Sequence, residues 1–595
     1  MESAQALDGD DATAGQQLNA ALDNGVAGLA CGADGWCRGR IPARIAVHSL
    51  APRNMRPAIK AGIGLCVKAT VEWIGILCGA GGAHGKAIHR GGRSVIGQRP
   101  DDGKARPAVG TPLQHLLLAA AASHGMHALV MTSGNLSEEP IETDDDLAWE
   151  RLVAAGIADA LLGNDRAILS RYDDSVARVV DGIVMPVRRA RGYAPQPLPL
   201  PALDGAPSCV LACGPQQKAT IALTREGTNG EATCFVSQHI GDVENGGTFD
   251  AWNAARTRLE DLFDLAPAAL ACDVHPSYLS GQWAREQAQK CNLPLVEVQH
   301  HHAHIASVMA EAIAAGQLTT DARVLGIAFD GTGAGTDGTI WGGEFLVASL
   351  GGFGRAAHLR TWALPGGAAS VRDARRNAFA LLSELGLLEH PGAARLLDSL
   401  DEQTRSVTAT MIERGINSPH TSSMGRLFDA AAAILSICDK ATYEGEPAIE
   451  LEAAAWRALD SEITHFPDDN AGYFASGPSW LDGSYVLDQK ALFVALLEGI
   501  EAGAPADRLA LDFHVAVARS SARIASDICV HEGIDTVALS GGVFMNRLLL
   551  QLLTRELKSA GLAILVPHTV PVNDGCIAYG QAAVASARLA QTASQ

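Results

Sequence analysis

The chain has 595 residues, of which 47% are hydrophobic, so two to four domains with large cores are expected. Its formal charge of −20 argues against broad nucleic-acid binding, and no uncharged apolar run of about 18 residues predicts a membrane span. The twelve cysteines form no CxxC pair and the acidic start "MESAQALDGDDATAG" does not resemble a secretion signal, so we expect a cytoplasmic protein with reduced thiols.

The first 110 residues have an unusual charge and glycine pattern. Between Gly25 and Pro100 there are eleven Arg and Lys residues and only two acids, whereas the remainder of the chain is acidic. The runs "CGAGGAHGK" and "HRGGRSVIG" show no sustained period of a strand or a helix. This contrast indicates a segment that has diverged or folds poorly.

From residue 111 onward the pattern predicts regular elements. The segment "PLQHLLLAAAASHG" predicts a helix, and "ALVMTSGNLSEEP" predicts a buried strand that runs into a loop. A helix with acids at its N-terminus is predicted for "DDDLAWERLVAAGI", because the helix dipole favours negative charge there. Short apolar runs between turns, from about 160 to 193, then predict strands.

Polar side chains in this part are candidates for binding an anionic ligand. Ser133 and Asn135, in the loop after the predicted strand, can hold a phosphate or adenine, or can form a simple capping turn. Arg171, Arg189 and Arg191 suit an anionic ligand, or equally form structural ion pairs.

A Pro-rich stretch, "APQPLPLPALDGAPS", predicts a linker at 199–208. The second unit, 209–590, contains a strand, a turn and a strand in "CVLACGPQQKATIALTREG", and the same order in "VLGIAFDGTGAGTDGTIWGGEFLVASL". A strand, a Gly-Gly turn and a helix follow in "TVALSGGVFMNRLLLQLLTREL", and long helices are expected over 374–387 and 508–530. Strands with glycine-acid turns in two halves, separated by helices, predict a two-lobed α/β nucleotide-binding fold.

The run "VQHHHAHIASVMAE" contains a candidate pair of metal ligands. On a helix, His300 and His304 are four residues apart and lie on one face, whereas His301 and His302 point elsewhere, to a supporting position or to the surface. Two imidazoles need further ligands to hold a divalent metal. Asp330 in "AFDGTG" and Asp574 in "PVNDGCIAYG" are acids at expected strand ends beside glycine, so these four residues form the predicted site. The alternative is a polar helix face.

Several turns and helix starts can approach a nucleotide closely, because glycine exposes backbone N–H groups there. Each of the candidate segments below can also be an ordinary turn, or a helix start whose acid is exposed to solvent. The candidates are Gly541, Gly542 and Asn546 in "SGGVFMN", Gly366 in "LPGG", Lys218 in "CGPQQK", and Gly425 with Asp429 in "SSMGRLFD".

These motifs resemble those of the HypF family, the carbamoyltransferases of nickel–iron hydrogenase maturation. The segments "MTSGNLSEEPI", "DDSVARVVDG" and "RRARGYAPQPLPLP" are similar to the family's YrdC-like domain. The segments "VQHHHAHIASVMAE", "AFDGTGAGTDGTIWGGEF", "SPHTSSMGRLFDAAAAILSI", "YEGEPAIELEAAA", "LSGGVFMNRLLL" and "PVNDGCIAYGQA" are similar to its TsaD-like domain. The resemblance implies an α/β chain with the remainder of a YrdC-like twisted domain at 111–198. A two-lobed actin/sugar-kinase-like (ASKHA) carbamoyltransferase domain is implied at 209–590.

The resemblance also implies two chemical steps. The YrdC-like domain joins carbamate, from carbamoyl phosphate, to ATP with Mg, giving carbamoyl adenylate and pyrophosphate, and an internal channel carries the adenylate onward. In the second domain, residues matching His300, His304, Asp330 and Asp574 hold a divalent metal, iron or zinc, which polarises the carbamoyl group. The acceptor is the C-terminal cysteine of HypE, and the carbamoyl group becomes the cyanide ligand of the hydrogenase iron.

The sequence departs from the family pattern in its first part. Family members begin with an acylphosphatase domain and two zinc fingers built on CxxC pairs; neither pattern occurs in this chain, so carbamate is expected to come from elsewhere. Of the basic stretch that grips the ATP phosphates, only "RNMRPAIK" is similar, with Arg56 and Lys60 as counterparts. One hypothesis is that 1–110, the start of the YrdC-like domain, is translated in a shifted frame.

Other interpretations remain open. An O-carbamoyltransferase of antibiotic biosynthesis has both domain types and the metal site, although in the opposite order. A tRNA threonylcarbamoyl-adenosine enzyme shares the fold, but the acidic charge and the "HHHAH" form of the histidine motif oppose it. An inactive remnant that binds HypE or a nucleotide without turnover is the non-enzymatic interpretation.

Overall fold

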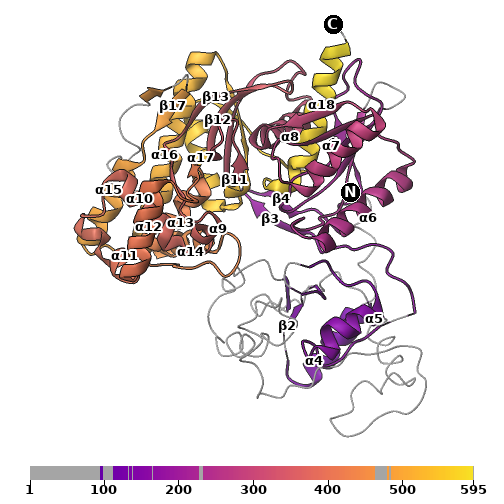
Figure 1. Ribbon diagram of the computed structural model, residues 1–595, viewed down its shortest axis with the longest axis horizontal. Helices are drawn as coiled ribbons and strands as arrows, with labels where there is room; N and C mark the ends of the chain where they lie inside the picture. Colours follow the sequence, from indigo (N-terminus) through magenta and orange to yellow (C-terminus); the bar gives the residue numbers. More distant parts are fainter. Residues whose placement is uncertain are drawn as a thin grey trace. The chain divides into compact units, whose positions relative to one another are not determined.

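The structure is a computed structural model that describes residues 94–97, 112–126, 128–131, 133–136, 139–163, 165–226, 232–461, 479–481 and 484–593. It divides into two compact units, Met1–Arg171 and Tyr172–Gln595, which are described separately (Figure 1). The expected divergent start, 1–110, lies outside the described residues except for 94–97, and so do Arg56 and Lys60. In the part of the chain that the structure describes, no helix is both long enough and apolar enough to cross a membrane.

The first unit contains the helices predicted from the pattern. Helix α4 (Pro112–Ser123) precedes strand β2 (Ala128–Met131), which pairs antiparallel with β1 (Ser94–Gly97). The acidic helix is α5 (Asp145–Ala148), continued by the π-helical η2 (Trp149–Ala154). It starts after Asp144, whose carboxylate accepts hydrogen bonds from the backbone N–H groups of Asp146 and Leu147, as expected for an N-cap.

The boundary between the units precedes the Pro-rich stretch. The hairpin β3 (Val176–Val180) and β4 (Ile183–Arg188) belongs to the second unit, as does β5 (Pro197–Leu200). Strand β5 includes the first residues of the expected linker and pairs with β8 (Ala232–Val236), with Leu198 and Leu200 buried. The alternation of proline and leucine makes this possible, because proline is tolerated in an edge strand and leucine fills the core.

One lobe of the second unit is built on a six-stranded sheet with the order β10-β9-β6-β7-β8-β5. Its remaining strands are β6 (Val210–Ala212), β7 (Ala222–Glu226), β9 (Ala269–Asp273) and β10 (Leu295–Val298). Helices α6 (Gly246–Phe263) and α7 (Leu279–Cys291) pack on it, around the fully buried Trp252.

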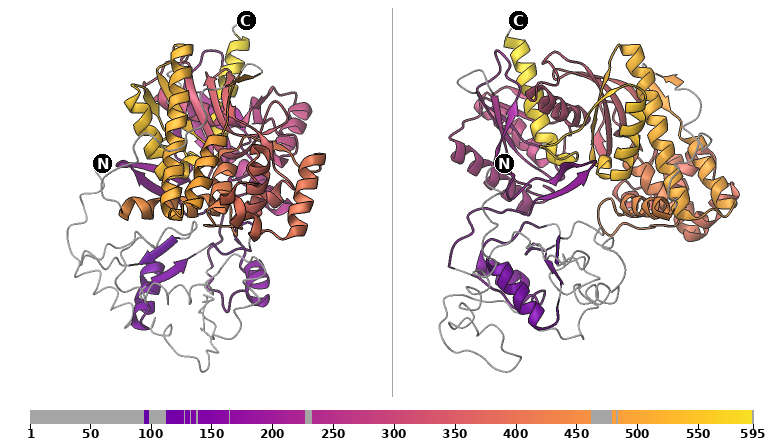
Figure 2. Two further views of the ribbon diagram at one scale, coloured as in Figure 1. Left: turned by 90° about the vertical axis from the view of Figure 1, so that its left-hand side faces the viewer. Right: turned by 180° about the vertical axis from the view of Figure 1, so that it is seen from behind.

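The other lobe contains a nine-stranded sheet, whose main order is β16-β17-β13-β12-β11-β18-β19. These strands are β11 (Val324–Ala334), β12 (Ile340–Ala348), β13 (Phe353–Leu359), β16 (Ser479–Leu481), β17 (Ser484–Leu487), β18 (Thr536–Ser540) and β19 (Ala563–Leu565), with β14 (Trp362–Ala363) and β15 (His420–Thr421) paired at its side. The helices of this lobe are α9 (Ala368–Arg372), α10 (Ala374–Leu385), η3 (Pro391–Ala393), α11 (Ala394–Ser399), α12 (Glu402–Arg414), α13 (Met424–Ile434), α14 (Glu446–Ser461), α15 (Lys490–Glu501), α16 (Ala506–Glu532), η4 (Gly542–Met545) and α17 (Arg547–Ser559). Figure 2 shows these helices, in orange, gathered on one side of the sheet.

Two helices occupy the space between the sheets: α8 (His300–Ala314) and α18 (Ile577–Ala593), which follows η5 (Asp574–Cys576). They lie side by side in Figure 1 and contact each other. Alternate residues of β11 point to opposite faces. Leu325 and Ile327 join the core of the helical lobe, whereas Val324 and Ala328 join the core that includes α8 and α18.

Glycines allow α8 to lie very close to its neighbours. A Cβ at Gly326 of β11 would overlap the side chain of Ile305, and a Cβ at Gly580 of α18 would overlap the carbonyl group of Ala303. At Gly333 a Cβ would lie 2.5 Å from the imidazole of His301. The helix that carries the histidines is therefore packed closely against glycines of β11 through its side chains and against Gly580 through its backbone.

Candidate metal centre

Helix α8 begins directly after β10, and the side chain of Gln299 caps it by accepting a hydrogen bond from the backbone N–H of His302. The helical period places His300 and His304 on one face, with ring centroids 5.0 Å apart. Both side chains are almost fully buried. The sequence predicted this pair, and the fold directs it toward Asp330 of β11.

Asp330 lies near the middle of β11, at the point where the regular pairing with β12 is interrupted. Parallel pairing of β11 with β18 brings the turn after Ser540 over this carboxylate, and the backbone N–H of Gly542 donates to Asp330 Oδ1 at 3.0 Å. On the other side, the hydroxyl of Ser423 donates to the Asp330 carbonyl oxygen at 2.9 Å. One carboxylate oxygen is thus held by the backbone, which leaves Oδ2 for the histidines.

Asp574 is the first residue of η5, the short helix that precedes α18. The side chain of Asn573 accepts from the N–H of Gly575 at 3.1 Å, and the N–H of Gly541 donates to the carbonyl of Val572 at 2.8 Å. These two hydrogen bonds fix the segment that precedes α18 against the Gly-Gly turn.

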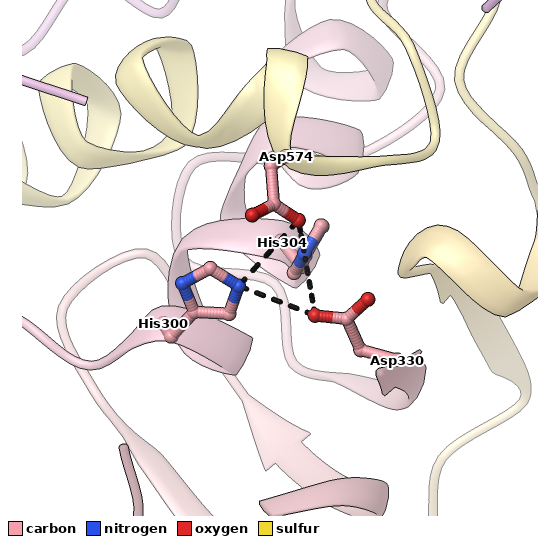
Figure 3. Close-up of side chains that lie close together, drawn as sticks. All are labelled: His300, His304, Asp330 and Asp574. Atoms are coloured by element: carbon pink, nitrogen blue, oxygen red, sulfur yellow. Dashed lines mark ion pairs between the residues drawn. The ribbon is translucent and has the colours of Figure 1, made fainter. Parts of the chain in front are cut away.

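The structure brings all four predicted side chains together in a buried cluster, and their candidate ligand atoms lie within 4.8 Å of one another. Figure 3 shows the two imidazoles and the two carboxylates converging on one point. His300 Nε2 lies 3.3 Å from Asp330 Oδ2 and 3.7 Å from Asp574 Oδ1, and His304 Nε2 lies 3.7 Å and 3.6 Å from the same two atoms.

The chemistry of these donors fits a divalent metal. Neither Nε2 atom makes a hydrogen bond of good geometry within the described part of the chain, although both are fully buried. Two ligands about 2.1 Å from a tetrahedral metal lie about 3.4 Å apart, which is close to the observed nitrogen–oxygen distances. Buried polar atoms are normally satisfied, so a cation between these donors explains their arrangement.

The electrostatics of the cluster favour positive charge. Burial alone would lower the pKa of His300 and His304. Asp574, Asp273 and Asp330 outweigh burial at His300, and Cys576 with Asp330 and Asp574 outweighs it at His304, so both pKa values lie well above the ordinary range. Burial would raise the pKa of Asp330, yet the two histidines hold it well below its usual value. A metal cation would supply the same compensation as these protons.

Each histidine also has a partner at Nδ1. His300 Nδ1 lies 3.0 Å from Asp273 Oδ2, and His304 Nδ1 lies 3.2 Å from the Ser540 hydroxyl and 3.3 Å from the thiol of Cys576. The sequence analysis missed these three residues. Asp273 in "LACDVH" could have been predicted as a further site residue, because it is an acid at the end of an apolar run. It has no glycine beside it, unlike Asp330 and Asp574.

The other two histidines turn away from the cluster, as predicted, but neither is on the surface. His301 Nδ1 contacts the side-chain amide of Gln299 at 3.0 Å, and His302 Nε2 contacts the carbonyl of Ser349 at 2.8 Å. Burial lowers the pKa of His301 to about 3 and that of His302 to about 4, so both rings are neutral at pH 7. The surface alternative was wrong because α8 is enclosed between two sheets.

The predicted nucleotide-binding glycines of the second unit support Asp330. A Cβ at Gly541, where φ is +110°, would overlap the carbonyl of Phe329, and a Cβ at Gly542 would lie 2.9 Å from Asp330 Oδ1. A Cβ at Gly425 would lie 3.0 Å from the Cα of Gly331. Their role toward a nucleotide stays a prediction.

Other predicted binding residues of this unit have identified partners. Asn546 caps α17 through Oδ1 and contacts His514 through Nδ2, and Asp429 is buried against Arg426 at 3.0 Å. Lys218 Nζ pairs with Glu444 at 2.7 Å.

Lys218 is also linked to the cluster. Burial alone would lower the pKa of Lys218, but Glu444 and Asp574 outweigh it and raise that pKa, so Lys218 lies within electrostatic range of the four-residue cluster. Gly366, with φ of +84°, forms the turn before α9, where its N–H donates to the carbonyl of Asn417.

The residues predicted to bind an anionic ligand lie on both sides of the boundary between Arg171 and Tyr172. In the first unit, Ser133 is exposed, Asn135 donates to the carbonyls of Leu136 and Glu139, and Arg171 donates to the carbonyl of Ile141.

Two further arginines belong to the second unit. Arg191 is exposed and lies 3.4 Å from Asp174. Arg189 is buried and donates to the carbonyls of Val236, Tyr193 and Gln196, so its role here is structural.

Family models match most of the second unit. One described as "HypF Kae1-like domain" matches residues 205–311, and one described as "Carbamoyltransferase, Kae1-like Domain, second subdomain" matches residues 326–581. These ranges contain all four residues of the cluster. The predicted α/β class with a two-lobed second domain is confirmed.

Curated relatives extend the similarity beyond this unit. Carbamoyltransferase HypF2 of Cupriavidus necator is 38% identical over 516 residues, covering 80% of this chain and 60% of the relative. Carbamoyltransferase HypF of Synechocystis is 37% identical, covering 79% and 58%. This chain therefore spans about three fifths of the length of these relatives. A shorter protein, the carbamoyltransferase HypF homolog of Cupriavidus necator, is 38% identical, and 92% of its length is covered.

Solved structures of HypF proteins are similar to this chain as well. A full-length HypF in a phosphate- and nucleotide-bound form has a TM-score of 0.70 at 36% identity, covering 80% of this chain and 58% of that one. HypF of T. kodakarensis has a TM-score of 0.66 at 32% identity, covering 78% and 57%. At this level of identity the similarity includes sequence as well as fold.

Proposed function

Because this chain belongs to the HypF carbamoyltransferase family, we propose that it transfers a carbamoyl group to the C-terminal cysteine of HypE during nickel–iron hydrogenase maturation. The reaction takes place in the cytoplasm. All eight cysteines that the structure describes are free thiols, which supports a reducing compartment. The net charge of −20 does not favour a nucleic-acid substrate.

The observation that carries this proposal is the buried cluster of His300, His304, Asp330 and Asp574. Mixed imidazole and carboxylate donors suit iron or zinc. When bound, such a metal supplies Lewis-acid polarisation of the carbamoyl oxygen. The protein's own contribution is orientation, since the N–H of Gly542 holds Asp330 and the Asn573 segment holds Asp574.

The proposed reaction proceeds in two steps. Carbamate, derived from carbamoyl phosphate, attacks the α-phosphate of MgATP, and pyrophosphate leaves. The HypE thiolate then attacks the carbamoyl carbon; the new carbon–sulfur bond replaces the bond to the AMP oxygen, and AMP leaves. We assign the first step to Ser133, Asn135 and Arg171 of the first unit, and the second to the four-residue cluster. Arg191 belongs to the second unit, and its role toward ATP stays a prediction. The candidates that hold the adenylate are Lys218, Gly366, Gly425, Asp429, Gly541, Gly542 and Asn546.

A mass measurement on HypE tests this function. Purified chain is mixed with ATP, Mg, HypE and carbamate, with carbamoyl phosphate in place of carbamate in a second reaction, and the intact mass of HypE is recorded. Because carbamate is expected to come from elsewhere, the reaction with carbamate is the decisive one. The proposal expects HypE to gain one carbamoyl group, and a HypE variant without its C-terminal cysteine to gain none. Transfer to a small-molecule hydroxyl in place of HypE would support the antibiotic alternative, and binding of HypE without any modification would support the inactive remnant.

A further inference from the structure

Asp273 is a buried acid that the four-residue cluster does not include. It ends β9, and the parallel register pairs it with Val298 of β10, two residues before His300. Its side chain is 1% exposed. The sheet therefore presents this carboxylate directly to the first turn of α8.

Both oxygens of Asp273 have a specific partner. Oδ1 accepts a hydrogen bond from the backbone N–H of His275 at 2.8 Å, and Oδ2 lies 3.0 Å from His300 Nδ1. An ionised carboxylate only accepts hydrogen bonds, so His300 must carry a proton on Nδ1 to bond with it. Nε2 is then the nitrogen that faces Asp330 and Asp574, where a metal can take the place of its proton.

We propose that Asp273 is a positioning residue that fixes His300 in the tautomer able to bind a metal through Nε2. Carboxylate partners of metal-binding histidines commonly have this effect on ring orientation and tautomer. His304 is held differently, because the hydroxyl of Ser540 and the thiol of Cys576 can each donate or accept. The tautomer constraint therefore acts on one histidine of the pair.

The substitution Asp273→Asn tests this constraint, because the side chain keeps its shape but gains a donor. The N–H of His275 still needs an acceptor and selects the amide oxygen. The amide nitrogen then faces His300 Nδ1 and donates to it, which moves the ring proton to Nε2 and blocks the metal position. Asp273→Ala removes the partner and leaves both tautomers accessible.

The measurement is Zn²⁺ affinity by calorimetric titration of the full chain, with thermal unfolding as the check of folding. We expect Asp273→Asn to weaken Zn²⁺ binding by about 10- to 100-fold, and Asp273→Ala to weaken it less. A merely structural role gives the reverse order, because asparagine is the better steric replacement. The matched control is Asp250→Asn, the same substitution at an exposed position of α6, which is expected to leave Zn²⁺ affinity unchanged.

The inference rests on the metal centre proposed above, and the same titration separates the two. If the wild-type chain does not bind Zn²⁺, both fail. If the wild type binds and Asp273→Asn binds equally well, or better than Asp273→Ala, only the positioning role is overturned. Should Asp273→Asn not fold, long-range ¹H–¹⁵N spectra of zinc-loaded wild type decide the matter: a proton on His300 Nδ1 supports the role, and zinc on Nδ1 contradicts it.

Discussion

Asp330 serves two partners with opposite requirements. Its Oδ1 accepts from the backbone N–H of Gly542, and its Oδ2 faces Nε2 of His300 and of His304, which would share a metal with it. A carboxylate meets both requirements because each of its oxygens can accept a hydrogen bond or bind a cation. The orientation of this one side chain therefore depends on the Gly-Gly turn, which the sequence analysis assigned to a nucleotide.

Replacing Asp330 with asparagine should separate these two roles. The amide oxygen keeps the bond to Gly542, but the amide nitrogen then occupies the position of a metal ligand. We expect Asp330→Asn to fold and to lose metal binding by more than about 100-fold, a larger effect than that of a supporting residue. Metal analysis of the purified variant checks this, with the exposed Asp337→Asn as the control. Wild-type metal content in Asp330→Asn would remove Asp330 from the site.

Among the elements, the contact between α8 and α18 depends on Gly580. Glycine inside a helix normally costs up to about 1 kcal/mol relative to alanine. In α18, however, a Cβ at this position would overlap the carbonyl of Ala303, which belongs to a packed helix and cannot move freely. The usual preference should therefore be reversed here.

We expect Gly580→Ala to lower the free energy of unfolding by about 1 to 3 kcal/mol, as overpacking does. We also expect it to weaken metal binding, because Asp574 lies in η5, which leads directly into α18. Urea unfolding and metal analysis measure the two effects. The matched control is Gly246→Ala at the start of α6, where a Cβ meets nothing within 4 Å. Equal effects of the two substitutions would show that the close contact is unimportant.

A second element-level feature ties β12 to β13 and to the start of α13. Glu344 is fully buried and accepts from Arg355 Nε at 2.7 Å, from the Ser422 hydroxyl at 2.5 Å and from the N–H groups of Gly342 and Gly343. Ser422 precedes the serine that holds Asp330. This network therefore supports the segment on which the metal site depends.

Glu344→Gln should destabilise the protein by about 3 kcal/mol near pH 7, because Arg355 loses a buried partner. Burial would raise the pKa of Glu344, but Arg355 outweighs it, and the pKa in the folded protein lies below the ordinary 4.5. The stabilisation is therefore present above pH 4.5 and lost as the pH falls through the folded value. Urea unfolding at a series of pH values should show the two proteins converging in acid; a constant difference would contradict the assignment.

For the whole molecule, the sequence predicted the features that depend on local pattern. The helical spacing of His300 and His304 and the two acids beside glycine, Asp330 and Asp574, were sufficient to name the cluster. The expected position of these acids at strand ends was wrong, because β11 continues past Asp330 to Ala334 and Asp574 lies in η5. Asp273 was missed because its position relative to His300 is set by the register of β9 against β10, which no local pattern contains. The burial of His302 was missed for a similar reason, since α8 is enclosed by elements far away in the sequence.

The packing of the Pro-rich stretch was also beyond local reasoning. A Pro-rich stretch is typical of a linker, and the sequence placed one at 199–208. In the structure Leu198 and Leu200 are buried in a strand that pairs with β8, so tertiary packing overrides the composition. The two compact units of the structure divide between Arg171 and Tyr172, and the domain bounds at 198 and 209 stay a prediction.

The central claim is that the four-residue cluster of the second unit performs carbamoyl transfer, while the first unit supplies the adenylate. Supplying preformed carbamoyl adenylate with HypE bypasses the first unit, and the intact mass of HypE reports the second step alone. We expect wild type and Ser133→Ala to add one carbamoyl group to HypE from the adenylate, with Ser133→Ala impaired only when carbamate and ATP are supplied. Asp574→Asn should add none from either source. Carbamoylation of HypE by Asp574→Asn at the wild-type rate would contradict the account.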